Sequence, residues 1–371
     1  MVMGRRPEVT TASMPITALD TLLLGQQLTV ALARIPFRRP LEGHSSRISN
    51  LGQNVTREVI RSFMGYVTSL PVPEFRSIEQ LLDDLCQVVM PPIVHARGIE
   101  RTVTEIGGVP GILYVPKGEI PRGVILYLHG GGYIGTSPAM YAFFTSRIAA
   151  TTRCAMFVAD YRLAPEFPFP AGRQDALDVL AAFAAAGVPE ERVFLAGDSG
   201  GGGLANSVVL SSGDDQLGRP AGLILFSPEV DLGLGEASVT ENAERDILPW
   251  NIPTVPYLHG ADPEDGELSS MNADLRGFPP TAISWGGDKM FRDPIRTFVQ
   301  RLEAADVPVH AHEIPGMFHV FQILMPWAEE SQLIYRHICR FVDQLLVDAP
   351  PLPDDVVTLL HGGWRGASPP G

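Results

Sequence analysis

The feature that most constrains the fold is a series of eight short β-branched or apolar segments that alternate with helical stretches after Glu100. Strands separated by helices are typical of a mainly parallel sheet, because parallel strands need a crossover connection. The first two segments are expected to form an antiparallel start. The predicted strands are 101–106, 111–115, 124–128, 155–159, 193–196, 223–226, 281–285 and 309–314. The sequence therefore predicts an α/β fold with a mainly parallel eight-stranded sheet and helices on both faces, at 138–150, 173–186, 200–211, 293–304 and 326–347.

Two further regions are predicted to form a helical cap on this sheet. Residues 1–95 precede the first strand and carry apolar residues at helical spacing, with a polar link around 43–54. An insertion at about 230–280 is too long for an ordinary connection and too apolar for a pure loop. Because α/β sheets bind ligands at the carboxyl ends of their strands, we expect both regions to cover that edge of residues 96–347. The segment 348–371, which is rich in proline and glycine, is expected to be a loose tail.

Ser199 is the candidate nucleophile. It follows the predicted strand at 193–196 and precedes an apolar helix, and Gly197 and Gly201 flank it in the spacing G-x-S-x-G. Glycines at these positions allow a tight turn from strand to helix that exposes the serine at a helix N-terminus. A bare G-x-S-x-G also occurs in ordinary glycine-rich turns, so the strand-turn-helix context carries the prediction.

A glycine-rich segment at the end of the third predicted strand offers backbone donors for an oxyanion. Gly131 and Gly132 lack side chains, so their N–H groups can face a developing negative charge, and the N–H of Gly200 is the expected third donor. The alternatives are a flexible glycine loop or a phosphate-binding turn. A dinucleotide loop fits less well, because the segment does not give G-x-G-x-x-G with a well-spaced acidic partner.

The base and the acid are expected after the last two strands. His319 follows the strand at 309–314 by a short loop that contains glycine, whereas His310 and His312 lie inside that strand and are interpreted as structural. Asp288 follows the seventh strand and would orient the imidazole of His319. Asp293 is the rival acid, but it is better placed to cap or pair within the next helix. The chain order serine, aspartate, histidine is that of α/β-hydrolases.

With these residues in place, the chain resembles the bacterial hormone-sensitive-lipase-like carboxylesterases, which have the α/β-hydrolase fold. The resemblance covers about residues 95–345 and departs from the family at Gly200, where alanine is usual, and at Phe167, where histidine is common. The matching segments are His129-Gly130-Gly131-Gly132-Tyr133, Asp160-Tyr161-Arg162-Leu163-Ala164-Pro165-Glu166, Pro168-Phe169-Pro170-Ala171, Gly197-Asp198-Ser199, Ser227-Pro228 and Asp231-Leu232. The resemblance implies that His129 supports the oxyanion loop and that the segment from Asp160 to Ala171 fixes loops beside the site.

The resemblance implies a lipid-metabolism esterase that hydrolyses short- to medium-chain esters and needs no metal or organic cofactor. Tyr133 and Phe318 adjoin the catalytic groups and are the expected substrate-binding residues; other wall candidates are Phe226, Trp250, Tyr257, Met290 and Met317. Two alternatives stay open, a noncatalytic ligand receptor on the same fold and a hydrolase of amides, lactones or a specialised natural product.

Charge and hydropathy bound the partners and the compartment. A net charge of −14 repels nucleic acid phosphates, so no nucleic-acid partner is expected. The apolar residues between Leu24 and Ile35 fall on one helical face, which predicts an amphipathic helix without stable membrane insertion, although that face could contact lipid in an interfacial lipase. Three separated cysteines exclude a disulfide framework. We expect a cytoplasmic enzyme that binds a small-molecule ester, with a homodimer as the alternative to a monomer.

Overall fold

The computed structural model describes residues 9–35, 47–212, 219–248 and 254–365. Its centre is one eight-stranded sheet in the order β1-β2-β4-β3-β5-β6-β7-β8. β2 pairs antiparallel with both β1 and β4, and all other neighbours are parallel. The strands are β1 (Ile99–Ile106), β2 (Val109–Pro116), β3 (Val124–Leu128), β4 (Ala155–Ala159), β5 (Val193–Asp198), β6 (Gly222–Phe226), β7 (Thr281–Gly286) and β8 (Val309–Ile314). The predicted α/β architecture is confirmed.

Side chains of the central strands alternate between two buried cores, as the two-residue repeat of a strand requires. In β3, Leu126 and Leu128 belong to one core, and Ile125 and Tyr127 belong to the other. Both cores are closed by helices, so the strands read as continuous apolar runs.

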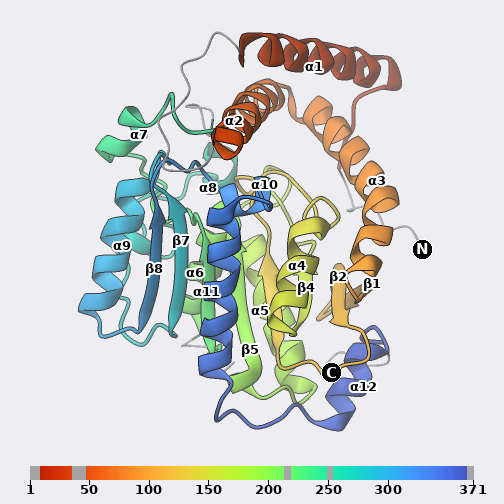
Figure 1. The fold of residues 1–371 in the computed structure, drawn as a ribbon, viewed down its shortest axis with the longest axis vertical. Coiled ribbons are helices and arrows are strands. Elements are labelled where there is room, and N and C mark those ends of the chain that lie inside the picture. Colours follow the sequence, from red (N-terminus) through yellow and green to blue (C-terminus); the bar gives the residue numbers. More distant parts are fainter. Residues whose placement is uncertain (1–8, 36–46, 213–218, 249–253, 366–371) are drawn as a thin grey trace.

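Helices cover the sheet on both faces (Figure 1). One core is closed by α4 (Ala142–Thr152) and α11 (Glu329–Leu345). The other is closed by α5 (Ala171–Ala185), α6 (Ser199–Ser212), α9 (Arg292–Ala304) and α12 (Asp354–His361). Shorter elements are η2 (Glu190–Arg192) and α10 (Phe321–Leu324).

The C-terminal segment is not loose up to residue 365, so this part of the prediction is wrong. Val356, Leu360 and Trp364 are buried in the same core as α5 and α6, and the ring of Trp364 lies 5.4 Å from that of Phe183. The proline and glycine content predicts an unpacked tail, but the apolar residues between them anchor the short helix α12. Residues 366–371 lie outside the described part of the chain.

The N-terminal helices are α1 (Met14–Arg34), α2 (Arg47–Val67) and α3 (Val72–Ala96). In Figure 1, α1 and α2 lie at the top of the molecule, and α3 descends along the right side toward β1. Helix α2 begins inside the segment predicted as a polar link, and α3 continues through Pro91 and Pro92. The insertion carries α7 (Ala237–Glu241), α8 (Val255–Leu258) and η3 (Ser270–Asn272).

Helix α1 is long and apolar enough to cross a membrane by length and composition, and 11% of its most apolar window is buried. Leu24 and Ala31 are buried, and Leu24 packs with residues of α2 and α3, whereas Leu32 of the same predicted face is 49% exposed. Met14 and Leu22 are exposed on the remaining surface. The prediction that this helix does not insert stably into a membrane stays a prediction.

Candidate active site

Ser199 lies at the turn between β5 and α6 in a strained backbone conformation, with φ of 51°. The two flanking positions leave no room for a side chain. A Cβ atom on Gly197 would lie 2.4 Å from the carbonyl oxygen of Gly201, and one on Gly201 would lie 2.1 Å from that of Leu128. These distances are far inside van der Waals contact, so the G-x-S-x-G spacing follows from the turn. A non-glycine residue held at positive φ is a sign of a functional constraint.

His319 meets the serine directly. Its Nε2 atom lies 2.9 Å from Ser199 Oγ, a hydrogen-bond distance, although the two residues are 120 positions apart. Burial, and secondarily the nearby positive charge of Lys289, hold the pKa of His319 well below its ordinary value. The imidazole is therefore neutral at neutral pH and able to accept a proton.

Asp288 lies on the loop after β7, where it was predicted, but it does not hydrogen-bond to His319. The Nδ1 atom of His319 is buried and has no hydrogen-bond partner among the described residues. The backbone N–H of Asp288 donates to the carbonyl of Met317 (2.9 Å), which holds the two loops together. Its carboxylate instead faces Arg57 of α2, with Nη2 and Oδ2 4.0 Å apart. The structure thus brings two of the three predicted groups together and places the third on an adjoining loop.

Asp293, the rival acid, is used elsewhere. Its carboxylate accepts a hydrogen bond from Arg292 Nε (2.7 Å) and pairs with Arg296 (3.4 Å) at the start of α9. These contacts agree with the interpretation of Asp293 as a residue of the helix start.

Gly131, Gly132 and Gly200 all line the same cavity as Ser199 and His319. Gly131 and Gly132 have φ of 115° and 62°, a region that favours glycine. Among the described residues, the N–H groups of Gly131 and Gly132 donate to no other group. Free backbone donors beside a serine hydroxyl suit an oxyanion.

Asp198 holds the glycine loop to the serine turn, a role that the sequence analysis missed. It is fully buried and accepts hydrogen bonds from Tyr127 Oη (2.7 Å), Tyr141 Oη (2.9 Å) and the N–H of Gly130 (2.9 Å). Burial raises the pKa of Asp198 to about 6, and these hydrogen bonds oppose the rise. The signal was available, because an aspartate ending a buried strand next to the serine must find partners.

Asp246 and Lys289 fix the opposite loops and were also missed. Asp246, in the insertion, is fully buried and accepts the N–H groups of Ile247, Met290 and His319, each at 2.8 Å. Lys289 is fully buried, and its Nζ donates to the carbonyls of Ser227 (2.7 Å) and Pro228 (2.9 Å). Lys289 adjoins a predicted acid, but nothing in the sequence distinguishes Asp246 from the other acidic residues of the insertion.

The cavity above Ser199 has a volume of about 290 Å³ and is mostly apolar. Tyr133 lines it and stacks on Tyr257, with ring centroids 3.8 Å apart. Phe318 does not line it, which contradicts its predicted role; the ring is fully buried in the core beneath Arg57. Trp250 lies outside the described residues. The apolar walls from the cap helices are Ile60, Phe63, Met64, Val67, Phe75, Ile78 and Leu82.

Glu229 is the one acidic side chain of the insertion that lines this cavity among the described residues. Its backbone N–H donates to the carbonyl of Ser199 (2.8 Å), and its side chain is buried. Burial raises the pKa of Glu229 to about 8, and Lys289 opposes the rise. Burial likewise lowers the pKa of Lys289 to about 7.

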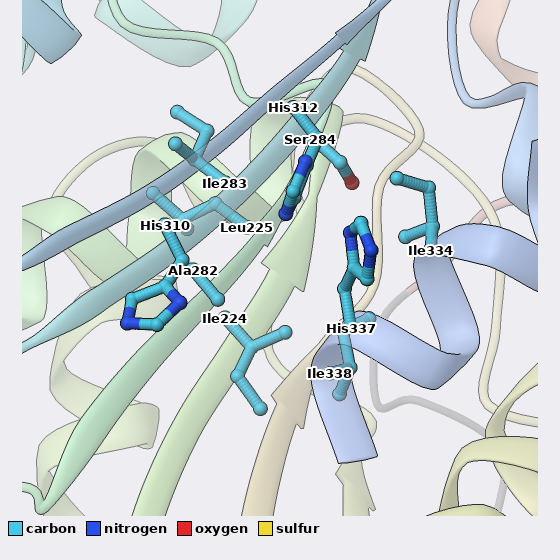
Figure 2. Close-up of a pocket in the computed structure, with 10 residues that line it drawn as sticks. All are labelled: Ile224, Leu225, Ala282, Ile283, Ser284, His310, His312, Ile334, His337 and Ile338. Carbon is cyan, nitrogen blue, oxygen red and sulfur yellow. The ribbon is translucent and has the colours of Figure 1, made fainter. Parts of the chain in front are cut away.

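The other histidines lie away from the serine. His129 is stacked on Tyr161 (4.6 Å) and its Nδ1 lies 2.8 Å from Thr136 Oγ1, so it braces the glycine loop. The rings of His312 and His337 lie with centroids 3.9 Å apart, beside a small pocket of about 10 Å³ between strands β6 to β8 and helix α11. Figure 2 shows the residues that line this pocket. Within the described residues, no group of three or more histidine, cysteine or acidic side chains could hold a metal ion.

Comparisons with known proteins agree with this geometry. The family model of the alpha/beta hydrolase fold matches residues 125–323. An acetyl-hydrolase of Streptomyces hygroscopicus is 35% identical over 212 residues, which cover 56% of this chain and 71% of that protein. A carboxylesterase of Mycobacterium tuberculosis is 31% identical, over 67% of this chain and 84% of that protein. The crystal structure of an esterase from the bacterial hormone-sensitive lipase family superposes with a TM-score of 0.71 and 29% identity, covering 80% of this chain and 98% of that one.

Proposed function

The chain belongs to the hormone-sensitive-lipase-like esterases of the α/β-hydrolase-fold family, and from that premise we propose that it hydrolyses short- to medium-chain carboxylic esters through Ser199, His319 and Asp288. Membership in this family makes the protein a carboxylic ester hydrolase. The observation that carries the finer proposal is the 2.9 Å contact between Ser199 Oγ and His319 Nε2 in a mostly apolar cavity.

The first half of the reaction acylates the serine. His319 Nε2 accepts the hydroxyl proton while Ser199 Oγ attacks the ester carbonyl carbon. The carbonyl oxygen gains the electron pair, and the N–H groups of Gly131, Gly132 and Gly200 stabilise it. When the carbon–oxygen bond of the ester breaks, His319 gives the proton to the leaving alcohol, and an acyl-serine remains.

The second half repeats these steps with water. His319 takes a proton from the water that attacks the acyl-serine, and the acid leaves as Ser199 recovers its proton. In this scheme Asp288 accepts a hydrogen bond from Nδ1–H of His319 and stabilises the imidazolium. That bond requires Oδ1 of Asp288 to move within reach of Nδ1, while Oδ2 faces Arg57 at 4.0 Å.

The walls of the cavity support the proposed substrate class. A volume of about 290 Å³ lined by Phe63, Val67, Ile78 and Tyr133 suits an apolar acyl chain of limited length. One relative is named an acetyl-hydrolase, which supports the short end of this range. A cytoplasmic location and a monomer or homodimer stay predictions.

A series of p-nitrophenyl esters from acetate to palmitate, assayed with matched variants, tests the proposal. We expect Ser199→Ala to lose about a thousandfold or more of kcat, because the nucleophile is gone. Ser211→Ala makes the same chemical change on the same helix, at a hydroxyl that donates to the carbonyl of Ser207 and to no other described residue, and should keep activity within about twofold. Equal activity of wild type and Ser199→Ala would end the proposal. Absence of turnover with every ester would favour a ligand receptor.

A further inference from the structure

Arg57 of the cap helix α2 is a buried cation whose neighbours are unusual. Its side chain is 3% exposed, and its guanidinium lies 5.6 Å from the ring centroid of Phe318, the residue before His319. None of its three nitrogen atoms makes a hydrogen bond to a described residue. A buried guanidinium has five N–H donors to satisfy, so this arrangement is costly unless a nearby negative charge compensates.

The compensating charge comes from the predicted catalytic acid. Arg57 Nη2 lies 4.0 Å from Asp288 Oδ2. Burial lowers the pKa of Arg57 to about 10, and Asp288, Asp246 and Glu58 oppose that change, so the guanidinium stays charged at neutral pH. Asp246 already accepts three backbone N–H groups with its two oxygens. The side chain of Asp288 makes no comparable set of bonds and is 16% exposed, so its position can respond to Arg57.

The two oxygens of Asp288 can be assigned to different partners. Oδ2 is the atom that faces Arg57, which leaves Oδ1 for Nδ1–H of His319, the buried nitrogen that has no hydrogen-bond partner among the described residues. A carboxylate accepts hydrogen bonds at both oxygens, so one side chain can serve both groups at once. The loops already touch, because the N–H of Asp288 donates to the carbonyl of Met317.

We infer that Arg57 is a positioning residue, which holds the Asp288 carboxylate by Oδ2 so that Oδ1 can orient His319. The N-terminal cap thereby takes part in assembling the catalytic groups as well as enclosing the substrate cavity. This inference rests on the proposed roles of Asp288 and His319. It predicts that losing Arg57 lowers the rate of the chemical steps while substrate binding by the apolar walls is kept.

A double-mutant cycle tests whether Arg57 acts through Asp288. We expect Arg57→Met to lower kcat for p-nitrophenyl butyrate about tenfold or more, with KM within about twofold. Arg57→Lys keeps a positive charge and should restore part of kcat. In the Asp288→Asn background, Arg57→Met should cause little further loss, because the group through which it acts is already removed. Equal loss in both backgrounds, or an unchanged kcat in Arg57→Met, would overturn the inference.

Two measurements separate this role from a merely structural one. Rates are normalised to the amount of serine that reacts in the burst of p-nitrophenol, so that misfolded protein does not lower the measured kcat. If Arg57→Met does not fold, Arg57→Lys replaces it as the test variant. Arg276→Met is the control for the same change of charge, since the side chain of Arg276 is 82% exposed and pairs with Asp274, which belongs to neither side of the site. We expect it to leave kcat unchanged. If Asp288→Asn itself kept full kcat, the proposed triad would fail before Arg57 is tested.

Discussion

Two groups of residues meet at the Ser199 hydroxyl and are held in different ways. The serine turn and glycine loop are fixed from within the α/β domain: Asp198 bonds Tyr127, Tyr141 and Gly130, all of which lie between β3 and α6 in the chain. The loops with Asp288 and His319 are fixed largely from the cap and the insertion, through Arg57 and Asp246. In the first group both carboxylate oxygens of Asp198 accept hydrogen bonds, whereas the second group leaves His319 Nδ1 without a hydrogen-bond partner among the described residues.

This difference shows that the oxyanion side of the site is preorganised, whereas the side with Asp288 and His319 depends on segments that are distant in sequence. Donors that are already fixed stabilise an oxyanion without reorganisation during the reaction. The acid–base side must still complete a hydrogen bond, and the residues that govern it lie far away in sequence. Substitutions on the first side should therefore act by steric disruption of the turn. Substitutions on the second side should act by loosening the loops that carry Asp288 and His319, with a smaller fall in rate.

Among substitutions that leave Ser199, His319 and Asp288 in place, the largest effect is expected from Gly201→Ala on the serine side. The new methyl group would lie 2.1 Å from the carbonyl oxygen of Leu128 and 2.4 Å from that of His129, and backbone cannot move aside easily. We expect esterase activity to fall by a hundredfold or more and the free energy of unfolding to fall by about 1–3 kcal/mol. Esterase assay and urea unfolding measure the two quantities.

The control for this change is Gly65→Ala in α2, where a Cβ would meet nothing within 4 Å. Alanine favours a helix over glycine by up to about 1 kcal/mol, so this variant should be as stable as wild type or more so. A Gly201→Ala enzyme with normal activity would show that the turn is less constrained than its contacts indicate.

Asp246→Asn should have the next largest effect and probes the acid–base side. Asp246 accepts the backbone N–H groups of Ile247, Met290 and His319. Asparagine keeps one acceptor oxygen but replaces the other with an NH₂ group, so at least one of these backbone N–H groups would face a donor and lose its hydrogen bond. We expect a loss of about 1–3 kcal/mol in the free energy of unfolding and about a tenfold fall in kcat. Normal kcat in the folded variant would mean that His319 is held by other contacts.

The same contrast explains what the sequence could predict. Ser199, His319 and the three glycines lie at ends of strands in short motifs, and the strand pattern placed all of them around one cavity. The contacts of Asp288, Arg57 and Asp246 depend on how the cap packs against the α/β domain. No motif in the cap helices predicts that packing. Phe318 was misplaced because adjacency to His319 in sequence does not determine which side of the loop faces the cavity.

Glu229→Gln is expected to alter the pH dependence of stability more than activity. Burial raises the pKa of Glu229 to about 8 from an ordinary value of 4.5, so the folded state binds more protons than the unfolded state between these values. The free energy of unfolding contributed by this group is thus fully present below about pH 4.5 and is lost as pH rises toward 8. Glutamine removes that ionisation, so the variant should lose less stability over this range.

Urea unfolding at intervals from pH 5 to pH 9 measures this difference. Lys289 changes the free energy of unfolding in the opposite direction. Its pKa is lowered from 10.5 to about 7, so the unfolded state binds more protons between these values and stability rises as pH increases above 7. The comparison is clearest below pH 7, where Lys289 is charged in both states. Parallel pH profiles of wild type and Glu229→Gln would show that Glu229 is ionised in the folded protein well below pH 8.

The smallest effect is expected at the histidine pair between β8 and α11, outside both sides of the site (Figure 2). Burial, followed by the charges of His337 and His310, lowers the pKa of His312 to about 4 from 6.5. The unfolded state then binds more protons between these values, so stability falls as pH drops from about 6.5 toward 4. His337→Gln removes one repulsive partner and should slightly reduce this acid sensitivity, without changing kcat at pH 7.5. If the variant were as acid-sensitive as wild type, the repulsion between His337 and His312 would not contribute to the loss of stability in acid.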